Sequence, residues 1–182
     1  MTNLQKKPFL VFLAGVHGVG KSTLCRTTFG LTGFHCVSAS SIIKSRAGEV
    51  YSDKSVGAID DNQRKLIEGV DSLRLQYARL VIDGHFALLN KERQVERIAA
   101  PVFRAIRPDL MILLYDDPSE IAMRLSHRDG RKWESELIEW MQNEERVHAE
   151  LVAADLNVRL EAISFANASV EIDQLLQKIA PP

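Results

Sequence analysis

Short apolar runs alternate with longer segments of helical periodicity along most of the chain. The runs are rich in β-branched and aromatic residues and predict strands at Phe9–Ala14, His35–Ser38, Leu80–Asp83, Leu110–Tyr115 and Asn157–Ile163. Between them, apolar residues recur every three or four positions and predict helices at Asp61–Tyr77, Glu92–Ile106, Pro118–His127, Trp133–Ala154 and Ala168–Ile179. Strands that alternate with helices indicate an α/β fold in which helices cover both faces of a five-stranded parallel sheet.

The length of the chain fits a single domain. Its 182 residues can bury a core that needs neither disulfides nor metal for stability. No internal repeat, low-complexity tract or linker divides it, so one domain over residues 1–182 is expected. The 23 Lys and Arg residues balance 24 Asp and Glu residues, which argues against a large basic surface for nucleic acid but leaves a local basic cleft open.

The cysteines and the apolar runs indicate in which cellular compartment the protein is expected. Cys25 and Cys36 have no metal-ligand spacing and are expected to be small buried side chains. No apolar run reaches the roughly 20 residues of a membrane span, and the polar first seven residues do not resemble a secretory signal. We therefore expect a cytoplasmic protein without a membrane segment.

The most specific motif is the octapeptide GVHGVGKS at Gly15–Ser22, which we call the P-loop. It matches the GxxxxGK[ST] pattern, follows the first predicted strand and opens a helix at Lys21. Its glycines let backbone N–H groups converge on phosphate, while Lys21 reaches the β- and γ-phosphates and Ser22 offers a hydroxyl to Mg²⁺. The dipole of the following helix favours the same anion. The alternative is a degenerate loop that binds nothing.

A carboxylate ends the third predicted strand, in the segment Asp83-Gly84-His85. The carboxyl ends of parallel strands line the ligand crevice, so Asp83 is expected beside the P-loop, where it would hold a Mg²⁺-bound water or orient a nucleophile. The alternative for Asp83 is a turn residue. For His85, a role in the site and a structural role stay equally open.

Two basic segments are further candidates for the site. Arg124, Arg128 and Arg131 lie where a helix gives way to a glycine-containing turn, and such arginines can fold over a phosphoryl group as a lid, here residues 124–133. The second segment, about residues 39–61, follows the second strand and is a candidate acceptor-binding insertion, with Ser38, Ser41, Lys44 and Arg46 as its candidate residues. The alternatives are a solvated charged surface for the arginines and helix capping for the serines.

Taken in order along the chain, these segments resemble the small nucleoside monophosphate kinases. Within that family they are most similar to archaeal-type adenylate kinases and to the adenylate kinase-like ATPases of ribosome maturation. The resemblance is carried by GVHGVGKST, VSASSIIK, IDDNQRKLIEGVD, VIDGHF and RPDLMILLYDDPSEIAMRL. It implies a three-layer P-loop NTPase fold with strand order 2-3-1-4-5 and a short lid.

The resemblance also implies functional roles. ATP and Mg²⁺ would be held by Gly15, Val16, His17, Gly18, Val19, Gly20, Lys21, Ser22 and Thr23 with Arg124, and Asp83 would hold the metal through water. Lys21, Asp83, Arg124 and Arg128 would be catalytic, and Ser38, Ser41, Lys44, Arg46, His85 and Arg131 would meet the acceptor. One departure is that Gly84–Leu89 contains no arginine for an acceptor phosphate, where the larger bacterial adenylate kinases have one.

Three functions follow as hypotheses. The first is phosphoryl transfer from ATP to a small acceptor, foremost a nucleoside or deoxynucleoside monophosphate. The second is an ATP-binding or ATP-hydrolysing switch that controls a protein or RNA partner. The third is a kinase for the hydroxyl group of a small metabolite or polynucleotide, with Asp83 as the base. Either a monomer or a dimer is compatible with the sequence.

Overall fold

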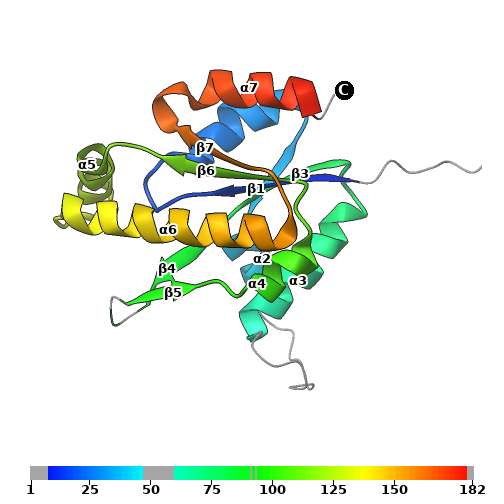
Figure 1. Cartoon of the computed structure of the whole chain (residues 1–182), viewed down its shortest axis with the longest axis horizontal. Coiled ribbons are helices and arrows are strands. Elements are labelled where there is room, and N and C mark those ends of the chain that lie inside the picture. Colours follow the sequence, from blue (N-terminus) through cyan, green and yellow to red (C-terminus); the bar gives the residue numbers. More distant parts are fainter. Residues whose placement is uncertain (1–7, 47–59, 91, 93, 180–182) are drawn as a thin grey trace, which may run out of the picture.

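The computed structural model describes residues 8–46, 60–90, 92 and 94–179. Its centre is a five-stranded parallel sheet in the order β2-β3-β1-β6-β7, which confirms the predicted order 2-3-1-4-5 (Figure 1). The strands are β1 (Phe9–Ala14), β2 (His35–Ser38), β3 (Arg79–Asp83), β6 (Leu110–Tyr115) and β7 (Leu160–Ser164).

Helices cover both faces of this sheet, as Figure 1 shows. They are α1 (Lys21–Leu24), α2 (Ala39–Ser45), α3 (Asp61–Arg74), α4 (Ala100–Ile106), α5 (Pro118–Asp129), α6 (Ser135–Leu156) and α7 (Ala168–Ile179). Helix α1 continues into a π-helical turn (Cys25–Phe29) and a 3-10 turn (Gly30–Thr32), and a further 3-10 turn (Phe165–Asn167) precedes α7. Among the described residues, no helix has the length and apolar character needed to cross a membrane.

Alternation along β1 explains the two core layers. Val11 and Leu13 face a cluster that includes residues of α5 and α7, while Leu10 and Phe12 face a cluster that includes residues of α3, α4 and α6. All four side chains are at most 2% exposed, as expected of a central parallel strand covered on both faces.

The register of the sheet places the ends of three strands together. Asp83, the last residue of β3, pairs with Leu13 of β1 on one side and with Ser38 of β2 on the other. The P-loop begins at Gly15, directly after β1. The carboxyl edge of the sheet therefore brings Asp83 and Ser38 to the P-loop, although they lie far apart in sequence.

One predicted helix is wrong in its first half. Residues 95–97 form strand β5 (Val95–Arg97), which pairs antiparallel with β4 (Ala87–Leu89), and helix α4 begins only at Ala100. Asn90 closes the hairpin, because its side chain accepts from the N–H of Gln94 at 2.8 Å and its own N–H donates to the Gln94 carbonyl at 2.9 Å. Pro101 then lies in the first turn of α4, where a missing N–H is tolerated.

The last predicted strand also begins later than expected. Asn157 ends α6 in the left-handed conformation, with a φ of 51°, and β7 starts at Leu160. Asparagine adopts this conformation more readily than most residues, so it terminates the helix. In the proposed insertion, residues 47–59 lie outside the described residues.

Candidate active site

The backbone of the P-loop requires glycine for conformation and for space. Gly15 has a φ of 140° and Gly20 a φ of 116°, values that side-chain-bearing residues rarely adopt. A Cβ atom at Gly15 would lie 2.6 Å from the Leu114 carbonyl oxygen, and one at Gly20 would lie 2.1 Å from the ring of Phe165. The loop is therefore closely packed between β6 and the segment after β7.

Lys21 is buried beneath this loop, with 6% of its surface exposed. Its Nζ atom donates to the carbonyl oxygens of Gly15, at 2.6 Å, and Val16, at 3.3 Å, and lies 3.7 Å from Oδ1 of Asp83. Burial lowers the pKa of Lys21, and the Asp83 carboxylate opposes that shift. An ammonium group in so little water interacts strongly with an incoming phosphate.

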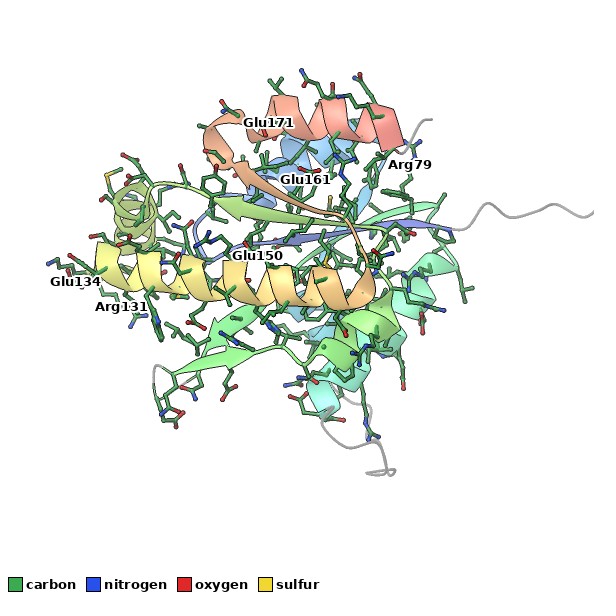
Figure 2. All side chains as sticks on the ribbon, viewed as in Figure 1. Arg79, Arg131, Glu134, Glu150, Glu161 and Glu171 are labelled. Carbon is green, nitrogen blue, oxygen red and sulfur yellow. The ribbon has the colours of Figure 1, made fainter. Side chains whose placement is uncertain are left out.

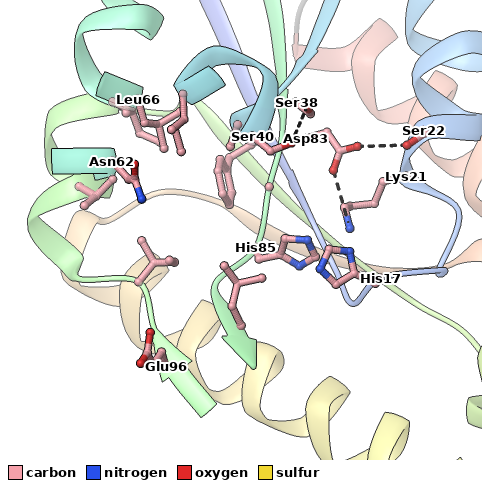
Figure 3. A pocket seen from close by; sticks show the side chains of 18 of the residues that line it. His17, Lys21, Ser22, Ser38, Ser40, Asn62, Leu66, Asp83, His85 and Glu96 are labelled. Atoms are coloured by element: carbon pink, nitrogen blue, oxygen red, sulfur yellow. Dashed lines mark hydrogen bonds and ion pairs between the residues drawn. The ribbon is translucent and has the colours of Figure 1, made fainter. Parts of the chain in front are cut away.

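Asp83 links the lysine to the serine of the P-loop. The Ser22 hydroxyl donates to Oδ2 of Asp83 at 3.4 Å (Figure 3). Burial raises the pKa of the Asp83 carboxyl group, while Lys21 and Ser22 act against the rise. A hydroxyl and a carboxylate so close together are the hard oxygen donors that suit Mg²⁺, which is bound through few protein ligands and several waters.

A buried glutamate that the sequence did not reveal lies behind the two histidines of the site. Glu145 of α6 is 1% exposed, its Oε2 accepts from the N–H of Phe86 at 2.6 Å, and its Oε1 lies 2.9 Å from Nδ1 of His85. The ring of His85 in turn lies against that of His17, with centroids 4.3 Å apart. The only signal in the sequence is a carboxylate four residues from both Met141 and Ala149 on the apolar side of the helix.

Burial explains the protonation of this cluster. It raises the pKa of Glu145 to about 7, although the Phe86 N–H and the nearby Lys21 each act to lower this pKa. Burial, together with His85, Lys21 and Arg128, lowers the pKa of His17 to about 4. The pKa of His85 is well below its usual value, again mainly through burial. Both histidines are therefore neutral at pH 7.

Arg124 of α5 lies at the other end of the P-loop. Its guanidinium group pairs with Asp116, donates to the Val19 carbonyl oxygen at 3.5 Å and lies 5.5 Å from the centre of the Phe165 ring. Phe165 also covers Gly20. A guanidinium plane and an aromatic ring thus flank the helix side of the loop. No pattern in the sequence predicted Phe165 here.

The other two arginines predicted for the lid lie in different surroundings. Arg128 lines the cavity described below, and its Nε is 2.6 Å from Oδ1 of Asp129. Arg131 does not line that cavity; it stacks on Trp133 at 4.7 Å, in the turn between α5 and α6 (Figure 2). The predicted lid is thus the last turn of α5 and a short connection.

A single cavity of about 960 Å³ runs from the P-loop to the opposite side of the site. At one end it is lined by His17, Gly18, Gly20, Lys21, Ser22, Thr23, Asp83, Arg124, Arg128 and Phe165. The other end, which we call the acceptor compartment, is lined by Phe12, Ser38, Ala39, Ser40, Ile43, Asp60, Asn62, Gln63, Leu66, Leu88, Glu96, Arg97, Ile98, Val102, Phe103 and Ile106. Figure 3 shows Asn62 and Leu66 across this space from Lys21 and Asp83.

Of the residues predicted to meet the acceptor, Ser38 and His85 line the cavity. Ser38 also caps α2, because its Oγ accepts from the N–H of Ser41 at 3.1 Å. Ser41, Lys44 and Arg46 lie outside the cavity lining, and Arg46 bonds to Glu68 at 2.9 Å. Val16 and Val19 of the P-loop are at most 1% exposed and pack into the core.

Comparison with known proteins gives one match to a family model, described as an AAA domain, over residues 14–142. No curated protein matches the chain in sequence.

Similar solved structures include a tunicamycin resistance protein from Deinococcus radiodurans, which is 14% identical, covers 96% of this chain and 97% of its own, and has a TM-score of 0.62. An uncharacterized protein from Eubacterium ventriosum ATCC 27560 is 9% identical, with coverages of 94% and 99% and a TM-score of 0.57. A gluconokinase from Sinorhizobium meliloti 1021 is 17% identical, with coverages of 93% and 89% and a TM-score of 0.48. At such identities the likeness to the first two of these structures is one of fold.

Proposed function

Because the chain belongs to the AAA-domain family and has a P-loop kinase-like fold, we propose that it transfers the terminal phosphoryl group of ATP to a small acceptor. The observation that carries this proposal is the single cavity of about 960 Å³ shared by the P-loop and the acceptor compartment. This volume lies near the upper end of the range for ligand pockets, roughly 300–1,000 Å³. A phosphoryl acceptor gives a use for the second compartment, which ATP binding alone does not.

In this function the residues near the P-loop act mainly by positioning and neutralising charge. Loop amides and Lys21 hold the phosphates, and Ser22 with Asp83 would hold Mg²⁺, partly through water. The metal supplies electrostatic stabilisation of the phosphates when bound. Arg124 and Phe165 flank the position of the base, and Arg128 extends the positive charge over the phosphates.

The acceptor is foremost a nucleoside or deoxynucleoside monophosphate. The acceptor compartment combines an apolar wall, formed by residues such as Leu66, Val102 and Phe103, with polar groups such as Asn62 and Gln63. Ligand pockets that bind ring systems are built in this way, with apolar contacts for the ring and a few polar groups for orientation.

A hydroxyl group on a small metabolite is the second candidate acceptor. Two observations favour it. Asp60 and Glu96 line the acceptor compartment against one arginine, Arg97, a balance that disfavours an anionic acceptor, and burial raises the pKa of Asp83. A carboxylate with a raised pKa is the better base for a hydroxyl proton. The tunicamycin resistance protein has a similar fold, and one fold can host many substrates, so the fold is compatible with such an acceptor.

The test is to measure ADP formation from ATP and Mg²⁺, alone and with a panel of nucleoside monophosphates and hydroxyl compounds. We expect ADP formation that depends on one class of acceptor, with a phosphorylated product seen by mass spectrometry. Lys21→Ala should abolish it, whereas the control Lys178→Ala, at an exposed position on α7, should not. ATP hydrolysis indifferent to acceptors would instead support the switch controlled by ATP, and full activity in Lys21→Ala would overturn the assignment.

A further inference from the structure

Three side chains from distant parts of the sequence form a continuous series of contacts from the middle of α6 to the P-loop. Glu145 contacts His85 at 2.9 Å, and the His85 and His17 rings are 4.3 Å apart with planes tilted by 52°. Figure 3 shows both rings side by side, facing the same space as the Lys21 ammonium group. The series ends at a residue of the P-loop itself.

The carboxylate at the start of the series uses both of its oxygens. One accepts from the N–H of Phe86 at 2.6 Å, and the other bonds to Nδ1 of His85. Burying a carboxylate beside an apolar core is unfavourable unless it is fully hydrogen-bonded, and an apolar residue of similar volume is often as stabilising. Glu145 fixes the orientation of His85, which an apolar residue in its place would not do.

His85 follows the end of β3, beside the P-loop, and its ring centroid lies 4.3 Å from that of His17. Because its Nδ1 is bonded to Glu145, the His85 ring cannot turn over without breaking that bond. It therefore presents a fixed face against which the His17 ring packs.

The place of His17 in the P-loop indicates which phosphate of a bound nucleotide it would face. Phe165 and Arg124 contact the Gly20 and Val19 end of the loop. His17 precedes them in the loop, and it lines the same cavity as Lys21 and Asp83. A triphosphate whose base lies beside Phe165 extends along the loop toward His17. Its terminal phosphoryl group then lies beside His17.

We propose that His17 donates a hydrogen bond to the terminal phosphoryl group of bound ATP, and that His85 and Glu145 are positioning residues that hold its ring in place. This inference rests on the proposed function to the extent that ATP must occupy the P-loop. A neutral imidazole has one N–H to donate, and the low pKa of His17 keeps it in that form. Such a donor is effective only when it is held within a fraction of an ångström.

The test compares two nucleotides that differ in the terminal group. Equilibrium binding of ADP and of the non-hydrolysable analogue AMP-PNP, both with Mg²⁺, is measured by calorimetry. We expect His17→Ala to lower the AMP-PNP affinity by about 10- to 100-fold and to leave the ADP affinity within about twofold, because a hydrogen bond to a charged group is lost. His17→Asn, which keeps an N–H donor, should restore part of the difference.

Variants of α6 test the positioning role. Glu145→Met keeps the volume but neither bond, and should lower AMP-PNP affinity selectively, whereas Glu145→Gln keeps hydrogen-bonding groups and should retain most of it. In the His17→Ala background, Glu145→Met should have no further effect, because the residue acts through His17. If Glu145→Met does not fold, His85→Gln is used for the same comparison, since it leaves α6 intact.

The outcomes separate the two proposals. Equal losses of ADP and AMP-PNP affinity in His17→Ala would overturn the contact with the terminal phosphoryl group. Additive effects of Glu145→Met and His17→Ala would overturn the positioning role. A wild-type chain that binds neither nucleotide would overturn the proposed function and this inference together, whereas selective losses without any acceptor-dependent transfer would overturn only the transferase.

Discussion

Gly20→Ala tests how tightly the P-loop is packed. The φ of Gly20 is 116°, and an added Cβ would lie 2.1 Å from Cε2 and 2.5 Å from Cδ2 of Phe165. Holding alanine in such a backbone conformation costs on the order of 1–3 kcal/mol, and displacing a packed ring costs about 1–3 kcal/mol more. We expect the free energy of unfolding to fall by about 2–6 kcal/mol, as the sum of these two effects.

Gly33→Ala is the matched control for this variant. Gly33 also has a positive φ, 77°, but a Cβ there would meet nothing within 4 Å. Only the backbone effect remains, about 1–2 kcal/mol. Urea unfolding followed by circular dichroism at 25 °C measures both variants, with equal slopes against urea required for the comparison.

Phe165→Ala separates the steric part from the backbone part. In the Phe165→Ala background, Gly20→Ala should cost about 1–3 kcal/mol less than in the wild type, because the clashing ring is gone. The same displacement moves the ring away from Arg124, so Gly20→Ala should also weaken ADP binding. If Gly20→Ala were as stable as Gly33→Ala, or if removing Phe165 gave no relief, the close packing of ring and loop would be refuted.

Three further predictions concern the site. Arg124→Ala should weaken ADP binding by about tenfold, because the contacts with Phe165 and Val19 are lost. Arg131→Ala, at a residue outside the cavity, should change ADP binding by less than about twofold. Equal effects of the two variants would contradict this assignment of the two arginines. Asp83→Asn should lower the rate of ADP formation by at least about 100-fold, because the oxygens that orient Mg²⁺ lose a charge, and a rate near that of the wild type would remove Asp83 from the site. Because burial raises the pKa of Glu145 to about 7 from 4.5, the folded state binds more protons than the unfolded state between these values, so this group's contribution to stability falls as pH rises through that range. The stability difference between wild type and Glu145→Gln, measured by urea unfolding, should therefore shift against the wild type from pH 5 to pH 7.5, and a constant difference would contradict the raised pKa.

Local sequence patterns predicted the strands and the P-loop well. The runs Phe9–Ala14 and Leu110–Tyr115 are strands with the expected bounds, because short continuous apolar runs are typical of strands covered on both faces. The strand His35–Ser38 also has the expected bounds. The glycine and lysine spacing of the P-loop is likewise a local requirement of its backbone. The helix predicted over Glu92–Ile106 is wrong in its first half. The hairpin found there depends on pairing between the separate segments β4 and β5, which no local pattern shows.

The rest of the site depends on contacts that no local pattern encodes. His85 and Glu145 are 60 residues apart, and Arg124 reaches Val19 across 105 residues. Whether Glu145 is solvated or buried depends on how α6 packs against the sheet, and whether Phe165 covers Gly20 depends on where β7 ends. The sequence by itself determined the phosphate-binding chemistry and the layered fold, because both follow from neighbouring residues. The tertiary structure decided which carboxylate, imidazole and aromatic ring surround the P-loop, because these groups meet only when the sheet order and the helix packing bring distant segments together.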